Sequence, residues 1–434
     1  MNVGFVSLGC SKNLVDTEML IGIFKENKYN IVNNPKEADI IVINTCGFIK
    51  SAKQEAIDTI LEMAEYKKTG KCKYIIAMGC LVKRYKKELI NALPEVDLFI
   101  SIDEYNEIWD KISNLLKSEN HLEKLDYLKR EITTGKTTAY LKIAEGCSNR
   151  CTYCAIPNIR GPYVSRKMEN ILKEAEHLSK KGIQEIIVIA QDTTKYGLDI
   201  YNKQMLPELL ENLSKISGIK WIRFLYAYPE SITDDLIQVV KNNNKICKYF
   251  DIPIQHISNA VLKRMNRKSD KESIENVIEK IRKEIPNVVI RTTVMVGFPG
   301  ETEKDFEELY NFVKNTKFDK LGAFMYSKEE NTPAEKLKDD VHYKTKQARY
   351  DKIMSMQKQI SLEKTKGLIG NEYIVLIDGK TQDNKFYVGR TYMDTLDMDG
   401  VVYIRNTSKE DLTNKFVNCK IIDSKEYDLI AEFV

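Results

Sequence analysis

The chain has 434 residues, 43% of them hydrophobic and 30% charged, which is ordinary for a globular protein of roughly two to four domains. No apolar run is long enough to span a bilayer, and residues 1–6 predict a strand rather than a signal peptide. We therefore expect no membrane partner and a cytoplasmic location. The formal net charge of +4 is too small to indicate a nucleic-acid-binding protein by itself.

Short apolar runs alternate with amphipathic helical stretches in the first region, residues 1–116. The runs are 3–8, 40–44 and 74–78. Strands that alternate with helices predict an α/β domain with a doubly wound parallel sheet. A charged and mostly helical connector is predicted around residues 118–136.

The alternation continues with a longer period in the second region, residues 133–366. The predicted strands are 139–144, 185–190, 221–226, 249–254, 288–296 and 320–326, with helices such as 169–180 and 271–284 between them. Six successive strand–helix units predict a partial (β/α)6 barrel of the TIM type. A long helix over 341–366 is expected to lead out of it.

The last region, residues 367–434, is rich in short β-type runs separated by turn residues. The runs are 372–377, 386–390, 400–404 and 417–422, and they predict a small all-β, OB-like barrel. This region has 8 Lys and Arg against 12 Asp and Glu, a net charge of −4, which leaves +8 on the rest of the chain. An acidic module binds phosphate poorly and suits a basic protein partner.

Three of the nine cysteines, Cys147, Cys151 and Cys154, form a C-x3-C-x2-C motif just after the first predicted barrel strand. Four thiolates normally hold an iron–sulfur cluster, so a set of three leaves one iron open. Such an iron binds S-adenosylmethionine and passes it an electron, which generates a 5′-deoxyadenosyl radical. The alternatives are a zinc site, which requires a fourth ligand although the nearest histidine is His177, or chance.

A second set, Cys10, Cys46 and Cys80, is separated by 36 and 34 positions. Each of these cysteines follows a predicted strand of the first sheet and lies beside a glycine. Because the carboxyl ends of parallel strands share one edge of the sheet, the three thiols should converge there and hold a second cluster. The alternative is that each is a small buried residue at the end of a strand. The other cysteines, Cys72, Cys247 and Cys419, show no such pattern and are predicted to be structural.

Polar residues and turns follow the predicted barrel strands, where this type of fold places its chemistry. The candidates for cofactor binding are Tyr153, Gln191, Gln255, His256, Gly297, Pro299 and Glu301. Ordinary caps, turns and a buried histidine are the alternatives. Arg160 and Arg166, just beyond the cysteine motif, either contact the site or belong to a solvated face.

Several segments together resemble the methylthiotransferases, a family of radical S-adenosylmethionine enzymes that insert sulfur and a methyl group into a C–H bond. The segments are SLGCSKNLVDTE from Ser7, CAIPNIRG from Cys154, QDTT from Gln191, DIPIQH from Asp251 and GFPGET from Gly297. The resemblance covers nearly the whole chain, and the stretch 389–400 is similar, more loosely, to the TRAM domain of the family. The motifs resemble most the branch that modifies an aspartate β-carbon in small-subunit ribosomal protein uS12.

The resemblance implies two [4Fe–4S] clusters and S-adenosylmethionine as cofactors. Cys147, Cys151 and Cys154 would hold the radical-generating cluster, and Cys10, Cys46 and Cys80 an auxiliary cluster whose open iron carries the sulfur. One S-adenosylmethionine would supply the methyl group and a second the radical, with flavodoxin or ferredoxin as electron donor. The acidic last region favours uS12 over a direct tRNA substrate. The alternatives are a tRNA adenosine methylthiotransferase and a non-catalytic iron–sulfur electron-transfer protein.

Overall fold

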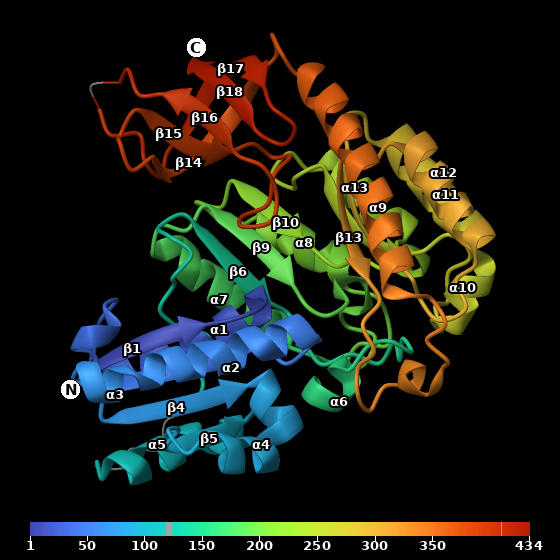
Figure 1. The fold of residues 1–434 in the computed structure, drawn as a ribbon. Coiled ribbons are helices and arrows are strands. Elements are labelled where there is room, and N and C mark those ends of the chain that lie inside the picture. The colour runs from blue at the N-terminus through green and yellow to red at the C-terminus, as the bar shows by residue number, and fades with distance from the viewer. Residues whose placement is uncertain (119–123, 409) are drawn as a thin grey trace.

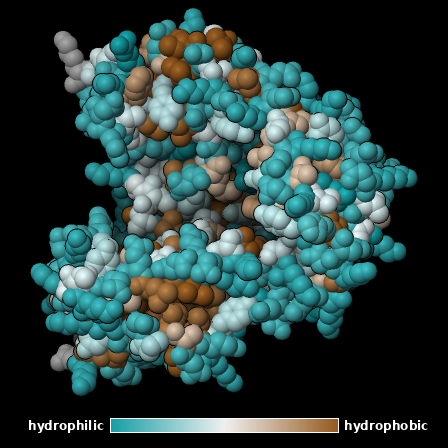
Figure 2. Space-filling model, viewed as in Figure 1, coloured by the Kyte–Doolittle hydropathy of each residue, from teal (hydrophilic) through white to brown (hydrophobic). Residues whose placement is uncertain are grey.

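The computed structural model describes residues 1–118, 124–408 and 410–434. A five-stranded sheet with its helices lies at one side of the molecule, the central strands and their helices form the middle, and a small β-barrel lies at the opposite side (Figure 1). The surface is hollowed between these two flanking parts, and hydrophilic residues cover most of the face in view (Figure 2). Within the described ranges, no helix combines the length and the apolar character that crossing a bilayer requires.

The N-terminal sheet is parallel throughout, with strand order β2-β1-β3-β4-β5. Its strands are β1 (Asn2–Ser7), β2 (Asn30–Ile31), β3 (Ile40–Thr45), β4 (Tyr74–Gly79) and β5 (Leu98–Ser101), and its helices are α1 (Ser11–Glu26), α2 (Lys50–Ala64), α3 (Tyr66–Thr69), α4 (Cys80–Ala92) and α5 (Ile108–Leu116). Every residue of β3 is buried, as expected for a central strand that is covered on both faces. The predicted doubly wound sheet is confirmed. The strand order reverses between β1 and β3, and ligands bind at such switch points.

The connector differs from its prediction. Part of it, residues 119–123, lies outside the described residues, and residues 124–136 form neither helix nor strand. Several of its polar groups bond to other elements: Arg130 pairs with Glu18 at 2.8 Å and with Glu174 at 3.0 Å. The backbone N–H of Thr133 donates to the Glu18 carboxylate at 2.7 Å. Contacts between domains therefore override the helical tendency of this charged segment.

The central part is a partial barrel built from two three-stranded parallel sheets. The strands are β6 (Thr138–Lys142), β9 (Glu185–Ile189) and β10 (Trp221–Phe224) in one sheet, and β11 (Tyr249–Gln255), β12 (Val289–Val296) and β13 (Lys320–Met325) in the other. A single isolated bridge between Ile222 and Ile246 links them. All six strands lie where they were predicted, within a few residues at their ends. The barrel is therefore confirmed, although its hydrogen-bonded ladder is interrupted after β10.

Helices cover the outside of these strands, as Figure 1 shows. They are α7 (Met168–Lys180), α8 (Leu206–Ser214), α9 (Asp234–Asn242), α10 (Asn259–Arg264), α11 (Lys271–Glu284), α12 (Glu303–Thr316) and α13 (Tyr343–Lys366), while α6 (Ile156–Arg160) and the short strands β7 (Ala144–Glu145) and β8 (Val164–Ser165) follow β6. On β12, Ile290 and Val294 pack in the core shared with the helices. Arg291 and Met295 alternate with them and are half-buried, so the inner wall of the barrel is partly polar.

The C-terminal region is a closed five-stranded barrel in the order β14-β15-β16-β18-β17. Its strands are β14 (Glu372–Lys380), β15 (Phe386–Arg390), β16 (Val402–Arg405), β17 (Phe416–Ser424) and β18 (Leu429–Phe433). The small β-barrel is confirmed, and the sequence reasoning missed only β18. This short last strand is defined by its pairing with β16 and β17, which no local pattern reveals.

The loop 391–399 between β15 and β16 fills the N-terminal end of the central barrel. Arg223 donates to the Tyr392 carbonyl at 2.7 Å, and Lys320 pairs with Asp394 at 2.7 Å. Tyr249 donates to Asp399 at 2.8 Å. Two of the acidic residues that gave this region its net charge of −4 are thus turned inward against cations of the barrel. The acid excess on the outer surface is smaller than the sequence count implied.

Arg390 supports a first prediction, because its guanidinium bridges Glu185 of β9 at 2.8 Å and Asp378 of β14 at 2.8 Å. Arg390→Lys keeps the charge but loses the fork of donors, so we expect the free energy of unfolding to fall by about 1–3 kcal/mol. Urea denaturation of the full chain measures this. The exposed Arg405→Lys is the control and should shift stability by less than about 0.5 kcal/mol. An equally small effect of Arg390→Lys would contradict the bridge.

Candidate active site

The three N-terminal cysteines converge at the carboxyl edge of the first sheet. Cys10 precedes α1, Cys46 follows β3, and Cys80 opens α4. Burial raises the pKa of the Cys80 thiol to about 12; Arg160 opposes this rise, and Cys10 and Cys46 add to it. The three sulfur atoms are therefore near enough to repel one another as thiolates. Cys10 and Cys46 follow β1 and β3, the strands on either side of the switch point.

The glycines beside these cysteines allow the loops to approach one another. A Cβ on Gly9 would lie 2.9 Å from the Cys46 sulfur, and one on Gly79 would lie 2.3 Å from Asn44 Oδ1. Gly79 also has φ +101°, which side chains rarely permit. The sequence reasoning expected these glycines to make room for a cluster. The contacts show instead that Gly9 and Gly79 allow a neighbouring loop to pack closely against them, which brings the cysteines near one another.

Backbone N–H groups are directed at the thiols of both sets. The amide of Phe48 lowers the pKa of Cys46, that of Asn149 lowers the pKa of Cys147, and that of Ile156 lowers the pKa of Cys154, each against the larger effect of burial. Cys10 is exposed, and its pKa falls below its usual value: desolvation by the surrounding atoms raises it, and Lys12, Arg160 and the amides of Asn13 and Lys12 together outweigh that rise. Donors of this kind stabilise thiolates, the form that ligates iron, so both sets fit an iron–sulfur cluster.

The remaining cysteines are distinguished by position rather than by amide contacts, since the amides of Tyr74 and Ile41 also lower the pKa of Cys72 against burial. Burial alone raises the pKa of Cys419 to about 12, and the Cys72 thiol donates to the Tyr74 carbonyl at 3.4 Å. Across the part of the chain that the structure describes, no three His, Cys, Asp or Glu side chains converge tightly enough to chelate one metal ion. A four-iron cluster holds its thiolates further apart than a single ion does, so this finding is compatible with two clusters.

The loop with Cys147, Cys151 and Cys154 is fastened to the end of α10. Thr152 donates through its backbone to the Met265 carbonyl at 3.0 Å and through its hydroxyl to the Arg264 carbonyl at 2.9 Å. Cys147 and Cys151 are buried and Cys154 is half-buried. Both contacts start from Thr152, so they fasten the middle of the cysteine loop to the end of α10.

Arg267 is a residue of this site that sequence reasoning missed. It is 8% exposed, and its Nη1 lies 3.9 Å from the Cys151 sulfur. Its Nη2 donates to the Pro253 carbonyl at 3.0 Å, and its guanidinium lies over the Tyr228 ring at 4.3 Å. Because Arg267 follows Cys151 by 116 positions, no spacing in the sequence could have linked them.

Several of the predicted cofactor-binding residues line the carboxyl mouth of the barrel. Gln191 and Gln255 are half-buried where β9 and β11 end, and Gln255 has φ +69° beside an irregularity in the ladder. The Tyr153 ring packs edge-on against Phe298, with centroids 6.5 Å apart. Contact of Tyr153, Gln191 and Gln255 with a cofactor stays a prediction that this placement favours.

Glu301 holds the turn formed by residues 297–300. Its Oε2 accepts from the backbone N–H groups of Gly297 at 2.6 Å and Phe298 at 3.2 Å, and its Oε1 pairs with Arg349 at 2.8 Å. Burial raises the pKa of Glu301 to about 7, with Arg349 opposing the rise. The Glu301 carboxylate is therefore occupied by contacts within the protein, while Gly297 and the buried Pro299 form the turn itself.

His256 lies behind the same turn. It is fully buried, its Nδ1 accepts from the Ser258 N–H at 3.0 Å, and its Nε2 is 3.8 Å from Glu301. Burial lowers the pKa of His256 to about 3, so the ring is neutral. Direct cofactor contact by His256 or Glu301 stays a prediction, and the contacts present favour a role in positioning the turn.

Glu301→Gln tests that role. An amide cannot satisfy the two N–H groups and a charged Arg349 together, so we expect the free energy of unfolding to fall by about 1–3 kcal/mol. Glu303 is a matched control, because its carboxylate contacts the same Arg349 at 3.0 Å but is 60% exposed. Glu303→Gln should cost less than about 0.5 kcal/mol in the same anaerobic urea titration. Equal losses in the two variants would contradict the role assigned to Glu301.

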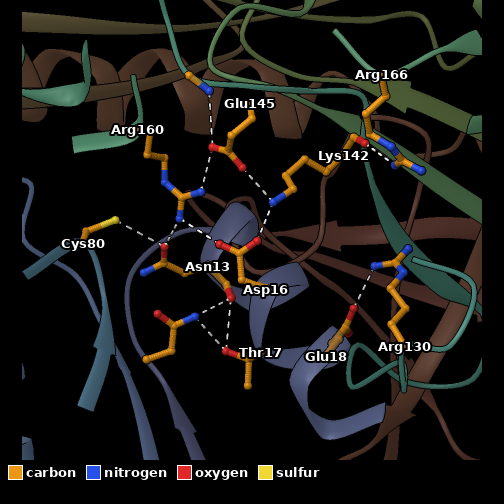
Figure 3. Close-up of polar contacts among 12 residues, drawn as sticks. Asn13, Asp16, Thr17, Glu18, Cys80, Arg130, Lys142, Glu145, Arg160 and Arg166 are labelled. Carbon is orange, nitrogen blue, oxygen red and sulfur yellow. Dashed lines mark hydrogen bonds and ion pairs between the residues drawn. The ribbon is translucent and has the colours of Figure 1, made fainter. Parts of the chain in front are cut away.

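A polar network links Cys80 and the start of α1 to Arg160 of the central domain (Figure 3). Arg160, six residues after Cys154, donates to Asn13 at 2.6 Å and pairs with Asp16 at 3.0 Å and Glu145 at 2.8 Å. Lys142 pairs with the same two carboxylates. The Arg160 side chain is 1% exposed, so the solvated-face alternative is wrong for it.

The Asn13 amide completes this link by donating to the carbonyls of Leu8 and Thr45, next to the cysteine loops. The other arginine of the prediction, Arg166, faces the connector instead. It pairs with Glu174 at 2.7 Å and lies over the Tyr127 ring at 3.5 Å.

Three known domain families match successive parts of the chain: the uncharacterized protein family UPF0004 over residues 2–101, the radical SAM superfamily over 141–313, and the TRAM domain over 369–434. Among solved structures, the radical S-adenosylmethionine methyltransferase TsrM from Kitasatospora setae superposes with a TM-score of 0.58 at 10% identity, over 77% of this chain and 73% of that one. This likeness concerns the fold alone. The family match over residues 141–313 assigns the central part of the chain to the radical SAM superfamily.

Relatives identify the family more closely. The chain is 66% identical to the ribosomal protein uS12 methylthiotransferase RimO of Alkaliphilus oremlandii, over 100% of this chain and 99% of that protein. It is 52% identical to the protein of the same name from Caldicellulosiruptor saccharolyticus, over the full length of both. The chain belongs to the RimO family of methylthiotransferases, and it is an enzyme of the transferase class.

Proposed function

We propose that this enzyme adds a methylthio group to the β-carbon of an aspartate in small-subunit ribosomal protein uS12. The observation that carries the proposal is the 66% identity, over the whole chain, to a uS12 methylthiotransferase. The cofactors are two [4Fe–4S] clusters and S-adenosylmethionine. When bound, they supply the carbon-centred radical that removes hydrogen from an unactivated C–H bond, the sulfur and the methyl group.

The six cysteines divide between the two clusters in this proposal. Cys147, Cys151 and Cys154 hold the radical-generating cluster, and Cys10, Cys46 and Cys80 hold the auxiliary cluster. The domains follow as 1–116 for the auxiliary cluster, 133–366 for the radical core and 367–434 for the TRAM domain. The places of the two sets support this division, because one lies at the ends of β1, β3 and β4 and the other in a single loop after β7.

The chain's own residues arrange the site for a protein substrate. Arg160 holds the Cys154 segment against the start of α1, which keeps the two thiol sets in one arrangement. The loop 391–399 occupies the N-terminal end of the barrel, so the substrate approaches the carboxyl end where the thiols lie.

The partners follow from this chemistry. uS12 is the protein substrate, and a ferredoxin or flavodoxin supplies the electrons. No direct tRNA substrate is proposed: the outer surface of the C-terminal barrel still carries exposed acids such as Glu372 and Glu432, which repel phosphates. The nine free cysteines suit a reducing cytoplasm, where we place the enzyme.

Anaerobic reconstitution followed by two assays tests the proposal. Incubation with S-adenosylmethionine, reductant and uS12 should release 5′-deoxyadenosine and give uS12 the added mass of one methylthio group on aspartate. A tRNA adenosine methylthiotransferase would instead modify tRNA in a parallel reaction. An electron-transfer protein would release no 5′-deoxyadenosine. Either of those results would overturn the proposed function.

A further inference from the structure

Lys12 is a buried cation beside the Cys10 loop, where it lowers the pKa of the Cys10 thiol. It lies two positions after Cys10, yet its ammonium reaches into the central domain. Its Nζ is 3.3 Å from the Ala190 carbonyl oxygen and 3.6 Å from the centre of the Tyr226 ring. Since Ala190 follows β9 and Tyr226 lies just beyond β10, the charge sits at the carboxyl mouth of the barrel.

This ammonium lacks a carboxylate partner among the residues that the structure describes, although Lys12 is only 4% exposed. Its three N–H donors have one long hydrogen bond and one aromatic face. A buried charge of this kind is strongly unfavourable unless an opposite charge compensates it. A cation–π contact recovers only about 2 kcal/mol when it is desolvated. No carboxylate among the described residues therefore compensates the charge of Lys12.

The neighbouring carboxylates are already committed. Asp16 and Glu145 together face two cations, Arg160 and Lys142, so that cluster is balanced without Lys12. The Cys10 thiol attracts Lys12, but Arg160 and two backbone amides stabilise that thiol as well. The positive charge of Lys12 is therefore available to bind an anionic ligand.

Tyr226, whose ring faces the Lys12 ammonium, has an unusual backbone conformation. Tyr226 has φ +62°, a region that is costly for a bulky side chain. Its N–H donates to Asp251 at 3.0 Å, and its carbonyl accepts from the Thr193 N–H at 3.2 Å. Strain of this kind persists where the surrounding structure fixes it, and it clusters at binding sites.

We propose that Lys12 binds the side-chain carboxylate of the aspartate to be modified. The inference rests on the proposed function and names the residue that selects an acidic side chain. The reacting β-carbon is bonded directly to that carboxylate, so an ion pair with Lys12 places it at the barrel mouth and beside the Cys10 loop. The substrate carboxylate supplies the carboxylate partner that Lys12 lacks. Its charge-assisted hydrogen bond to Lys12 makes aspartate bind more tightly than asparagine, its neutral isostere.

Binding of two forms of uS12 to the reconstituted full-length enzyme tests the proposal. One form carries the native aspartate and the other carries asparagine at that position, and anaerobic titration gives both dissociation constants. The wild-type enzyme should bind the aspartate form about tenfold or more tightly, as expected for a hydrogen bond between charged groups. Lys12→Met should remove this preference, and Lys12→Arg should retain it.

Lys68→Met is the matched control, because it removes an equal charge from a side chain that is 75% exposed. It should leave the preference for aspartate unchanged. Iron content is measured for every variant. An undiminished preference in Lys12→Met overturns the inference, and iron loss with that preference intact would assign Lys12 to the thiolates alone. If the wild-type enzyme neither binds nor modifies uS12, the proposed function itself fails, which is a different result.

Discussion

Replacing Cys46 by alanine is expected to abolish methylthio transfer while S-adenosylmethionine cleavage continues. Cys46 belongs to the set that gathers at the edge of the first sheet, whereas Cys147, Cys151 and Cys154 lie in a loop of the central barrel. The iron content of anaerobically prepared protein should fall from about eight to about four atoms per chain. Iron analysis, 5′-deoxyadenosine release and the mass of uS12 measure the three consequences.

Cys72→Ala is the matched control for this experiment. Cys72 is buried in the same domain, just before β4, and its thiol donates to a backbone carbonyl. Its replacement should leave the iron content and the methylthio product unchanged, with a stability loss of about 1 kcal/mol. Full iron occupancy in Cys46→Ala, or continued modification of uS12, would contradict the assignment of Cys46 as a ligand.

Much of the fold was predictable because buried parallel strands are continuous apolar runs with turns at their ends. The strands β3, β4 and β9 are runs of this kind, and the sequence places them within a few residues. The connector after α5 was not predictable. Its charges match a solvated helix by composition, but Arg130 is 1% exposed and pairs across two domains.

The thiol sets could be predicted because each cysteine has a local signal, either a short spacing or a place at the end of a strand. The residues around them have no such signal. Lys12, Lys142 and Arg160 are charged side chains that composition assigns to a surface, and only the packing of the two domains buries them. The same effect weakened the charge argument for the C-terminal region, since Asp394 and Asp399 face inward.

Arg160→Met is expected to lower the free energy of unfolding by about 3–5 kcal/mol. The guanidinium donates to Asn13 and forms ion pairs with Asp16 and Glu145. Without it, one of the two carboxylates has no cation to balance its charge. Lys142 then faces both carboxylates alone. Anaerobic urea denaturation of the cluster-free full chain measures this loss without any contribution from cofactor binding.

A double-mutant cycle separates this charge balance from a simple loss of packing. In Asp16→Asn combined with Arg160→Met, the remaining Lys142 and Glu145 still form a matched pair, 2.9 Å apart. The double variant should therefore be more stable than the sum of the two single losses predicts, by about 1 kcal/mol or more. Strict additivity would mean that Arg160 fills space and bonds to Asn13 without compensating Asp16. The two domains would then be joined by shape rather than by the buried ion network.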